Sequence, residues 1–287
     1  MDTKKLSNNG ITAFIDILGF SERIASIAPE DIAQSIKDIE ELVTIFHKAC
    51  GHGNETKDEL CADMYSILGK NVLAFSDCVV VHVPLENSLA ITIYNKFDLI
   101  IGELVEIAFA QTNCISQKNI FMRGAVDIGW WYQNESVLIS QSLLRAYKME
   151  SNDVQYPVVA LTDKLFEYLL ECQMFPIENN QLEYPVKYPI EKLIRKKSIE
   201  NKKGEINDIH YIDYINVHID LVSNSQKCFS PEEYTSMFLK HHAKRISIEF
   251  ANASCEKVKQ KYIWLANYHN EVVNEREMDK SCCCNLF

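Results

Sequence analysis

One apolar segment covers residues 11–21 and reads ITAFIDILGFS. β-Branched and aromatic residues dominate it up to Gly19, which is typical of a buried strand that ends in a turn. Asp16 is the single carboxylate within this strand. A second apolar segment, NVLAFSDCVVV (71–81), also holds one carboxylate, Asp77. The second segment predicts a hairpin with Asp77 in its turn, so both carboxylates are expected where strands end.

An ionised carboxylate among Ile, Phe and Val is costly unless a cation or a hydrogen-bond donor compensates it. Two such residues, Asp16 and Asp77, suggest a shared compensator. Hard oxygen ligands of this kind favour Mg²⁺ or Mn²⁺ with a bound polyphosphate. The backbone N–H groups of Gly19, Phe20 and Ser21 can hold phosphate where the chain enters the next helix. These residues together predict a site for two-metal phosphoryl transfer.

The remaining pattern predicts an α/β domain with a mixed sheet and helices on its faces. Further strands are expected at residues 121–128, 158–161 and 210–218. Helical periodicity is present over residues 29–50, 88–110, 141–150, 162–173 and 231–273. The expected division is a catalytic domain over 1–222, a helical C-terminal extension over 223–281 packed on it, and a frayed tail over 282–287. Residues of about 174–207, rich in Pro, Asn and Lys, predict an irregular insertion in the first domain.

Composition excludes several classes of protein. The chain has 287 residues, of which 47% are apolar, as expected of a folded globular protein. Its net charge of −11, with no Lys/Arg-dense stripe beyond residues 192–203, argues against a nucleic-acid duplex as the main ligand. No apolar run approaches the length of a membrane-spanning helix. The ten cysteines have no CxxC spacing, which indicates a reduced, cytoplasmic protein.

Several segments carry a resemblance to a known family. They are AFIDILGFS (13–21), FSDCVVV (75–81), MRGAVDIG (122–129), SLLRAYKMES (142–151) and KYIWLANYHN (261–270). The first resembles the F-x-D-I-x-G-F signature of class III nucleotide cyclases, and the second lies where those enzymes carry a Gly-Asp hairpin. As a set, the segments resemble more narrowly the bacterial anti-phage pyrimidine cyclases of the Pycsar type.

The resemblance implies a homodimer with active sites at the subunit interface. Each site would convert a nucleoside triphosphate to its 3′,5′-cyclic monophosphate and pyrophosphate. Asp16, Asp77 and the Ile17 carbonyl would hold two Mg²⁺ or Mn²⁺ ions, and the turn at 19–21 would hold the phosphates. The downstream partner would be a separate effector that senses the cyclic product.

The resemblance also bears on the choice of base. Adenylate cyclases place an adenine-reading Lys four residues before the hairpin Asp, where this chain has Leu73. That departure favours another base or another route to reading it. The resemblance to the pyrimidine cyclases implies a pyrimidine, with UTP ahead of CTP. Two alternatives stay open: an adenylate or guanylate cyclase with unusual base contacts, and a catalytically inactive cyclase fold that dimerises or senses a ligand.

Two basic residues on the expected helix 141–150, Arg145 and Lys148, are candidates for the cation that stabilises the transition state. The family carries an Asn-x-x-x-Arg pair, and Gln141 and Arg145 have this spacing. If the chain is instead aligned on the Met149-Glu150 pair that follows, Lys148 takes the Arg position. Arg145 is preferred because a planar guanidinium suits phosphate oxygens. On the preceding strand, Arg123 is expected to form a structural ion pair, and Asp127 is expected to be solvated.

Overall fold

The computed structural model describes residues 8–19, 28–48, 69–75, 78–86, 95–174, 189–223 and 230–286. The strands are β1 (Asn8–Ile17), β2 (Asn71–Phe75), β3 (Cys78–Pro84), β4 (Met122–Gln133), β5 (Leu138–Ser140), β6 (Val159–Leu161), β7 (Ile194–Glu200) and β8 (Ile206–Ile212). The longer helices are α2 (Ile32–Lys48), α5 (Lys96–Asn113), α6 (Gln141–Asn152), α7 (Asp163–Met174), α9 (Tyr214–Ser223), α10 (Pro231–Asn252) and α11 (Glu256–Glu275). The shorter ones are η2 (Pro29–Asp31), η3 (Cys114–Lys118), α8 (Ile190–Leu193) and η4 (Lys280–Cys282).

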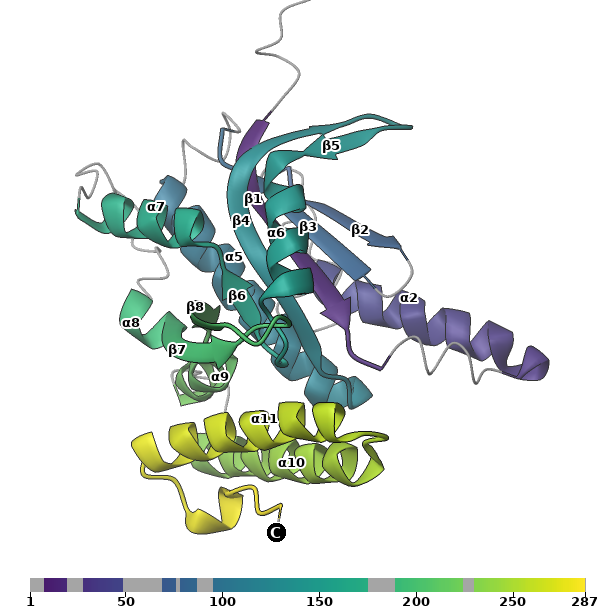
Figure 1. The fold of residues 1–287 in the computed structure, drawn as a ribbon, viewed down its shortest axis with the longest axis vertical. Coiled ribbons are helices and arrows are strands. Elements are labelled where there is room, and N and C mark those ends of the chain that lie inside the picture. The colour runs from purple at the N-terminus through teal and green to yellow at the C-terminus, as the bar shows by residue number, and fades with distance from the viewer. Residues whose placement is uncertain are drawn as a thin grey trace, which may run out of the picture.

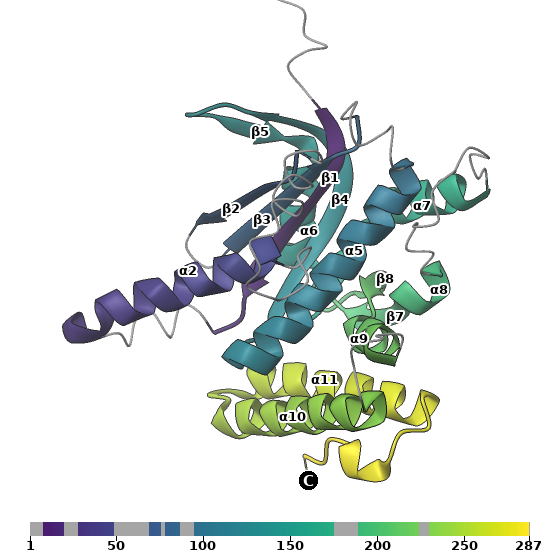
Figure 2. The same ribbon diagram turned by 180° about the vertical axis from the view of Figure 1, so that it is seen from behind.

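The strands form one sheet in the order β2-β3-β1-β4-β6-β8-β7, with β5 paired to β4. Its pairs are antiparallel except for β4 and β6, which run parallel. Helix α6 covers one face of the sheet and α5 the opposite face, while α10 and α11 lie beyond one end of the strands (Figures 1 and 2). The predicted fold class, a mixed sheet with helices on its faces, is therefore confirmed.

Alternation along β1 decides which face each side chain meets. Ile11, Ala13, Ile15 and Ile17 join the main core. Thr12 and Phe14 face α6, because Thr12 hydrogen-bonds to Ser142 and the Phe14 ring contacts Tyr147. Asp16 continues this second series, so the sequence of β1 aims its carboxylate at the α6 side of the sheet.

One described helix, Lys96–Lys118, is long and apolar enough to cross a membrane by length and composition. Of the stretch that passes this test, 72% is buried inside the protein. Ile100, Leu104 and Ala108 on α5 are fully buried in the main core. The segment therefore has the environment of a core helix.

Two expectations for residues 174–218 are wrong where the structure describes them. Residues 194–200 and 206–212 form an antiparallel hairpin at the sheet edge instead of an irregular insertion. Ile194 and Ile199 are buried, and Arg195 and Lys197 between them are partly buried against α11, so a Lys-rich composition conceals a half-buried edge strand. The expected strand 210–218 stops at Ile212, and Asp213 then caps α9 by accepting the backbone N–H of Asn216.

The C-terminal region departs from expectation in two places. The expected helix 231–273 is two helices, because extended backbone at Ala253 ends α10. The expected frayed tail is packed over residues 282–286: Cys282 is fully buried, and the Asn270 side chain bonds both the N–H and the C=O of Cys284. Cysteine behaves here as a small apolar residue. The division at residue 222 stays a prediction, and residues of α10 and α11 share the main core with the sheet.

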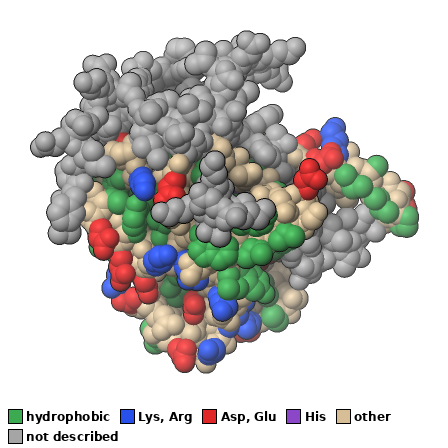
Figure 3. All heavy atoms as spheres, turned by 90° about the horizontal axis from the view of Figure 1, so that it is seen from above, with side chains coloured by type: hydrophobic (Ala, Val, Ile, Leu, Met, Phe, Trp, Pro, Cys, Tyr) green, Lys and Arg blue, Asp and Glu red, His purple; other side chains and the backbone are tan. Residues whose placement is uncertain are grey.

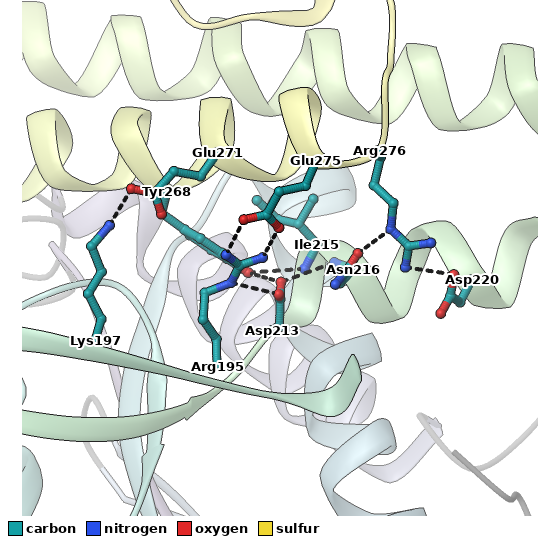
Figure 4. Close-up of polar contacts among 10 residues, drawn as sticks. All are labelled: Arg195, Lys197, Asp213, Ile215, Asn216, Asp220, Tyr268, Glu271, Glu275 and Arg276. Carbon is teal, nitrogen blue, oxygen red and sulfur yellow. Dashed lines mark hydrogen bonds and ion pairs between the residues drawn. The ribbon is translucent and has the colours of Figure 1, made fainter. Parts of the chain in front are cut away.

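A polar seam fastens α11 to the sheet edge (Figure 4). Arg195 on β7 donates to Asp213 at 2.8 Å and to both carboxylate oxygens of Glu275 at 2.9 and 2.6 Å. Asp213 is 3% exposed and also accepts the Tyr268 hydroxyl at 2.6 Å. Lys197 pairs with Glu271 at 2.6 Å one turn away. These contacts fix the position of α11, which becomes important for the site described below.

A chain of buried side chains connects α9, α10, α11 and η4. His269 Nε2 lies 2.7 Å from the Cys282 carbonyl, His242 Nδ1 lies 2.9 Å from His269 Nδ1, and Tyr214 Oη lies 2.8 Å from His242 Nε2. With both imidazole rings neutral, one assignment of their N–H protons gives every group in this chain a hydrogen-bond partner. His269 donates to the carbonyl and accepts from His242, which in turn accepts from Tyr214.

This arrangement predicts acid sensitivity. Burial lowers the pKa of His242 and of His269, and it lowers the pKa of His218 to about 4. In the unfolded chain these side chains would take up protons below about pH 6.5. The free energy of unfolding should therefore fall as the pH drops from 6.5 towards 4, by at most about 1.4 kcal/mol per histidine per pH unit. Urea denaturation at several pH values measures this, and an unchanged midpoint between about pH 7 and 5 would contradict it.

Candidate functional site

Asp16 lies near the end of β1, with its side chain 15% exposed. Arg123 on the neighbouring β4 stands directly opposite in the strand register. Arg123 Nε and Nη2 lie 2.9 and 2.8 Å from Asp16 Oδ2, and Nη2 lies 2.7 Å from Oε1 of Glu150 on α6. The structural ion pair expected of Arg123 is confirmed. One guanidinium thus serves two carboxylates, which leaves an excess negative charge within this triad.

Glu150 was not among the residues singled out from the sequence. Burial raises its pKa, the positive charge of Arg123 lowers it, and the nearby Asp16 raises it again. The position of Glu150 on the helix could have marked it in the sequence. Residues 143, 146 and 150 lie on one face of α6, and this face places the Glu150 carboxylate against the sheet. An acidic residue on the buried face of a helix indicates that a cation or donor on the opposing strand compensates its charge.

The oxygens at this end of β1 fit a hard divalent cation. The donor set comprises the Asp16 carboxylate and the Ile17 carbonyl, and all-oxygen sets suit Mg²⁺ and Mn²⁺. Asp77 lies outside the described residues, directly before Cys78, which pairs with Asp16 in the sheet. Within the described part of the chain, no group of three or more His, Cys, Asp or Glu side chains could hold a metal ion.

The turn after β1 is described only up to Gly19. Leu18 donates its backbone N–H to the Phe121 carbonyl at 3.0 Å, which holds the turn against β4. Gly19 has a φ of +76°, a left-handed conformation that favours glycine. The other two residues expected at the phosphates, Phe20 and Ser21, lie outside the described residues.

Arg145 is bound tightly to the strand beneath α6. Its Nε lies 2.6 Å from Oδ2 of Asp127, and its Nη2 lies 2.7 Å from the Ile128 carbonyl. Thr162 also donates to Asp127, which is fully buried. The expectation that Asp127 is solvated is therefore wrong, because β4 continues to Gln133 and α6 packs over its middle, where Asp127 lies. A Cβ at Gly129 would lie 2.9 Å from Arg145 Nη2, so glycine there leaves room for the guanidinium.

Lys148 and Gln141 are both exposed on α6. Lys148 and Arg145 line a cleft of about 480 Å³, together with residues of α7 and β8 that include Asp163 and Asn207. Lys148 precedes the buried Glu150 by two residues, which is about 200° around a helix. Lys148 therefore points away from the Asp16 of its own chain, and the fold does not bring these two predicted residues together.

Leu73 lies on β2, opposite Val80 of β3, and is partly buried against a small cluster that contains Phe14. Its apolar side chain cannot hydrogen-bond to a base. Large exposed apolar side chains occur nearby on four elements. They are Phe75 of β2, Trp130 of β4, Ile139 of β5, and Leu144 and Tyr147 of α6. Seen from above, hydrophobic side chains gather at the centre of the molecule (Figure 3).

Comparisons with known proteins give distant similarities. No family model matches the sequence, and no curated protein matches it. The guanylyl cyclase domain of the RhoGC fusion protein from the aquatic fungus Blastocladiella emersonii is 10% identical, with a TM-score of 0.42, over 72% of this chain and 96% of that chain. A bacterial light-regulated adenylyl cyclase is 13% identical, with a TM-score of 0.40, over 81% of this chain and 98% of that chain.

The catalytic core of a rhodopsin-guanylyl cyclase with converted specificity, in complex with ATPalphaS, is 12% identical, with a TM-score of 0.42. It covers 72% of this chain, and this chain covers 96% of it. All three similar structures are of nucleotide cyclases. At TM-scores near 0.4 they assign no activity to this chain, whose function is argued below from its own residues.

Proposed function

We propose that this protein is a metal-dependent nucleotide cyclase. In the reaction, the 3′-hydroxyl oxygen of a nucleoside triphosphate attacks its α-phosphorus and loses its proton. The bond between the α-phosphorus and the bridging oxygen breaks, and pyrophosphate leaves. The observation that carries this proposal is Asp16, a largely buried carboxylate that ends a core strand directly before the glycine turn.

Asp16, Asp77 and the Ile17 carbonyl would hold two Mg²⁺ or Mn²⁺ ions. When bound, such ions activate the attacking hydroxyl and neutralise the leaving pyrophosphate. Arg123 pairs with Asp16 and fixes one of its oxygens at 2.8 Å. Gly19, with Phe20 and Ser21, would bind the phosphates through backbone N–H groups.

The contacts on α6 support different roles for Arg145 and Lys148. Arg145 is occupied by Asp127 and the Ile128 carbonyl, so it anchors the helix. Lys148 is exposed on the rim of the cleft and would stabilise the charge on the α-phosphate. This reverses the preference for Arg145 drawn from side-chain chemistry. Gln141, exposed at the start of the same helix, is the proposed second member of the pair.

We infer a homodimer from the same geometry. Since Lys148 points away from its own Asp16, the Lys148 of one copy would act on the substrate bound at Asp16 of the other. The exposed apolar side chains of β2, β5 and α6 would supply the contact surface. A two-fold dimer of this kind contains two identical composite sites.

The base, the biological role and the location rest on the resemblance alone. Leu73 at the base-reading position supports a pyrimidine, with UTP ahead of CTP. The cyclic product would act as a second messenger in anti-phage defence and reach a separate sensing effector. A cytoplasmic location, with neither nucleic acid nor membrane as a partner, completes the proposal.

One observation favours a second candidate, a catalytically inactive cyclase fold that dimerises or senses a ligand. Arg123 already compensates Asp16, so a metal ion is not required to offset the burial of this charge. The experiment is incubation of the purified protein with ATP, GTP, CTP and UTP in the presence of Mn²⁺, with products identified by mass. A cyclic pyrimidine supports the proposal, and a cyclic purine would make it an adenylate or guanylate cyclase. Bound nucleotide without any product would favour the inactive fold.

A further inference from the structure

Four basic side chains gather near the end of β1, in a protein whose net charge is −11: Lys202 and Lys261 interact electrostatically with Arg123 and Asp16, and Lys257 interacts with both lysines. Arg123 belongs to β4, and Lys202 lies in the turn between β7 and β8. Lys257 and Lys261 come from the first turns of α11. Three separate parts of the sequence thus supply positive charge to one place.

Packing contacts hold these parts together. Phe121, directly before β4, accepts the backbone N–H of Leu18, and its ring centroid lies 6.1 Å from that of Tyr262 on α11. The backbone N–H of Lys202 donates to the Asn152 carbonyl at the end of α6 at 3.1 Å. The first turns of α11 therefore lie beside the end of β1 and the start of β4 (Figure 1).

The cations act on one another. Burial lowers the pKa of Lys261, the charges of Arg123, Lys202 and Lys257 lower it further, and Asp16 raises it. Burial, Arg123 and Lys257 likewise lower the pKa of Lys202. Glu150 also acts on Lys202, and both carboxylates, Asp16 and Glu150, already share the Arg123 guanidinium. Lysines gathered in this way attract an anion, which would relieve the repulsion between them.

We propose that Lys257 and Lys261 bind the polyphosphate tail of the substrate, so that α11 forms part of the active site. This inference rests on the proposed function and adds a phosphate-binding element to it. Lysine suits this role because its ammonium group is a point charge on a flexible stem that can follow phosphate oxygens. The seam from Arg195 to Glu275 keeps α11 in place while the two lysines engage the anion.

The test measures binding of inorganic tripolyphosphate by calorimetry in metal-free buffer, using the full chain. Lys257→Gln/Lys261→Gln should bind tripolyphosphate about tenfold more weakly than the wild type. Its Tm should be unchanged or higher, because repulsion between cations is relieved. Lys240→Gln/Lys244→Gln, which removes two exposed charges from α10, is the matched control and should bind like the wild type.

Equal affinity of the wild type and the Lys257/Lys261 variant would overturn the inference, as would a wild type that does not bind tripolyphosphate. If the double variant has a lower Tm, Lys257→Gln alone decides, because this side chain is exposed. It should bind about threefold more weakly, and unchanged binding would overturn the inference. Tripolyphosphate binding through these lysines in a protein that forms no cyclic nucleotide would contradict only the proposed function.

Discussion

Asp16→Asn is expected to lower the rate of cyclic nucleotide formation by about 1,000-fold or more. The amide keeps the size of the side chain and an oxygen for Arg123, but it removes the charge that a divalent cation needs. Arg123 retains Glu150 as a partner at 2.7 Å, so the Tm should change little. The measurement combines initial rates across a range of Mn²⁺ concentrations with thermal melting.

Glu233→Gln is the control for Asp16→Asn, because Glu233 is an exposed carboxylate on α10. It should leave both the rate and the Tm unchanged. Full turnover by Asp16→Asn would show that Asp16 is only the structural partner of Arg123, and the proposed metal site would then be wrong.

Arg145→Met is expected to lower the stability of the protein, whereas Lys148→Met is expected to lower its rate. Removing Arg145 leaves the fully buried Asp127 without its cation and should cost about 3–5 kcal/mol of unfolding free energy. Removing the exposed Lys148 should leave stability unchanged and lower the rate about 100-fold, as expected for the loss of one group that stabilises transition-state charge. Urea denaturation and initial rates, measured on both variants, separate the two effects.

A double variant checks the cause of the predicted instability. Adding Asp127→Asn to Arg145→Met removes the stranded charge and should recover part of the lost stability. A stable Arg145→Met protein with a collapsed rate would assign the transition-state role to Arg145 instead, as its guanidinium chemistry first suggested.

The residues explain why parts of this fold could be predicted from the sequence. In β1 and α6, local pattern and tertiary environment agree, so the strand and the helix were placed within a few residues of their ends. In β7 the charged side chains belong to an edge strand of a hairpin with β8, and the composition of residues 194–200 gave no sign of that pairing. The apolar residues 210–218 were expected to form one strand, but the chain changes from strand to helix at Asp213. The only sequence sign of this change is Asp213 itself, whose side chain caps the helix.

The candidate site was predictable to a similar extent. Asp16 stood out because a lone carboxylate in an apolar strand is conspicuous, and Arg123 was correctly expected to form an ion pair. Glu150, Lys257 and Lys261 could not be linked to it, since their proximity depends on how α6 and α11 pack against β4. The roles of Asp127 and Arg145 depended in the same way on which strand lies beneath α6.

The central claim is a cyclase site shared between two copies, with Asp16 from one and Lys148 from the other. The most direct test mixes the Asp16→Asn and Lys148→Met proteins in equal amounts, after subunit exchange, and measures cyclic nucleotide formation. Half of the dimers would then be mixed, each with one intact site, so the mixture should recover about one quarter of the wild-type rate. A mixture no more active than the average of its two components would contradict the shared site.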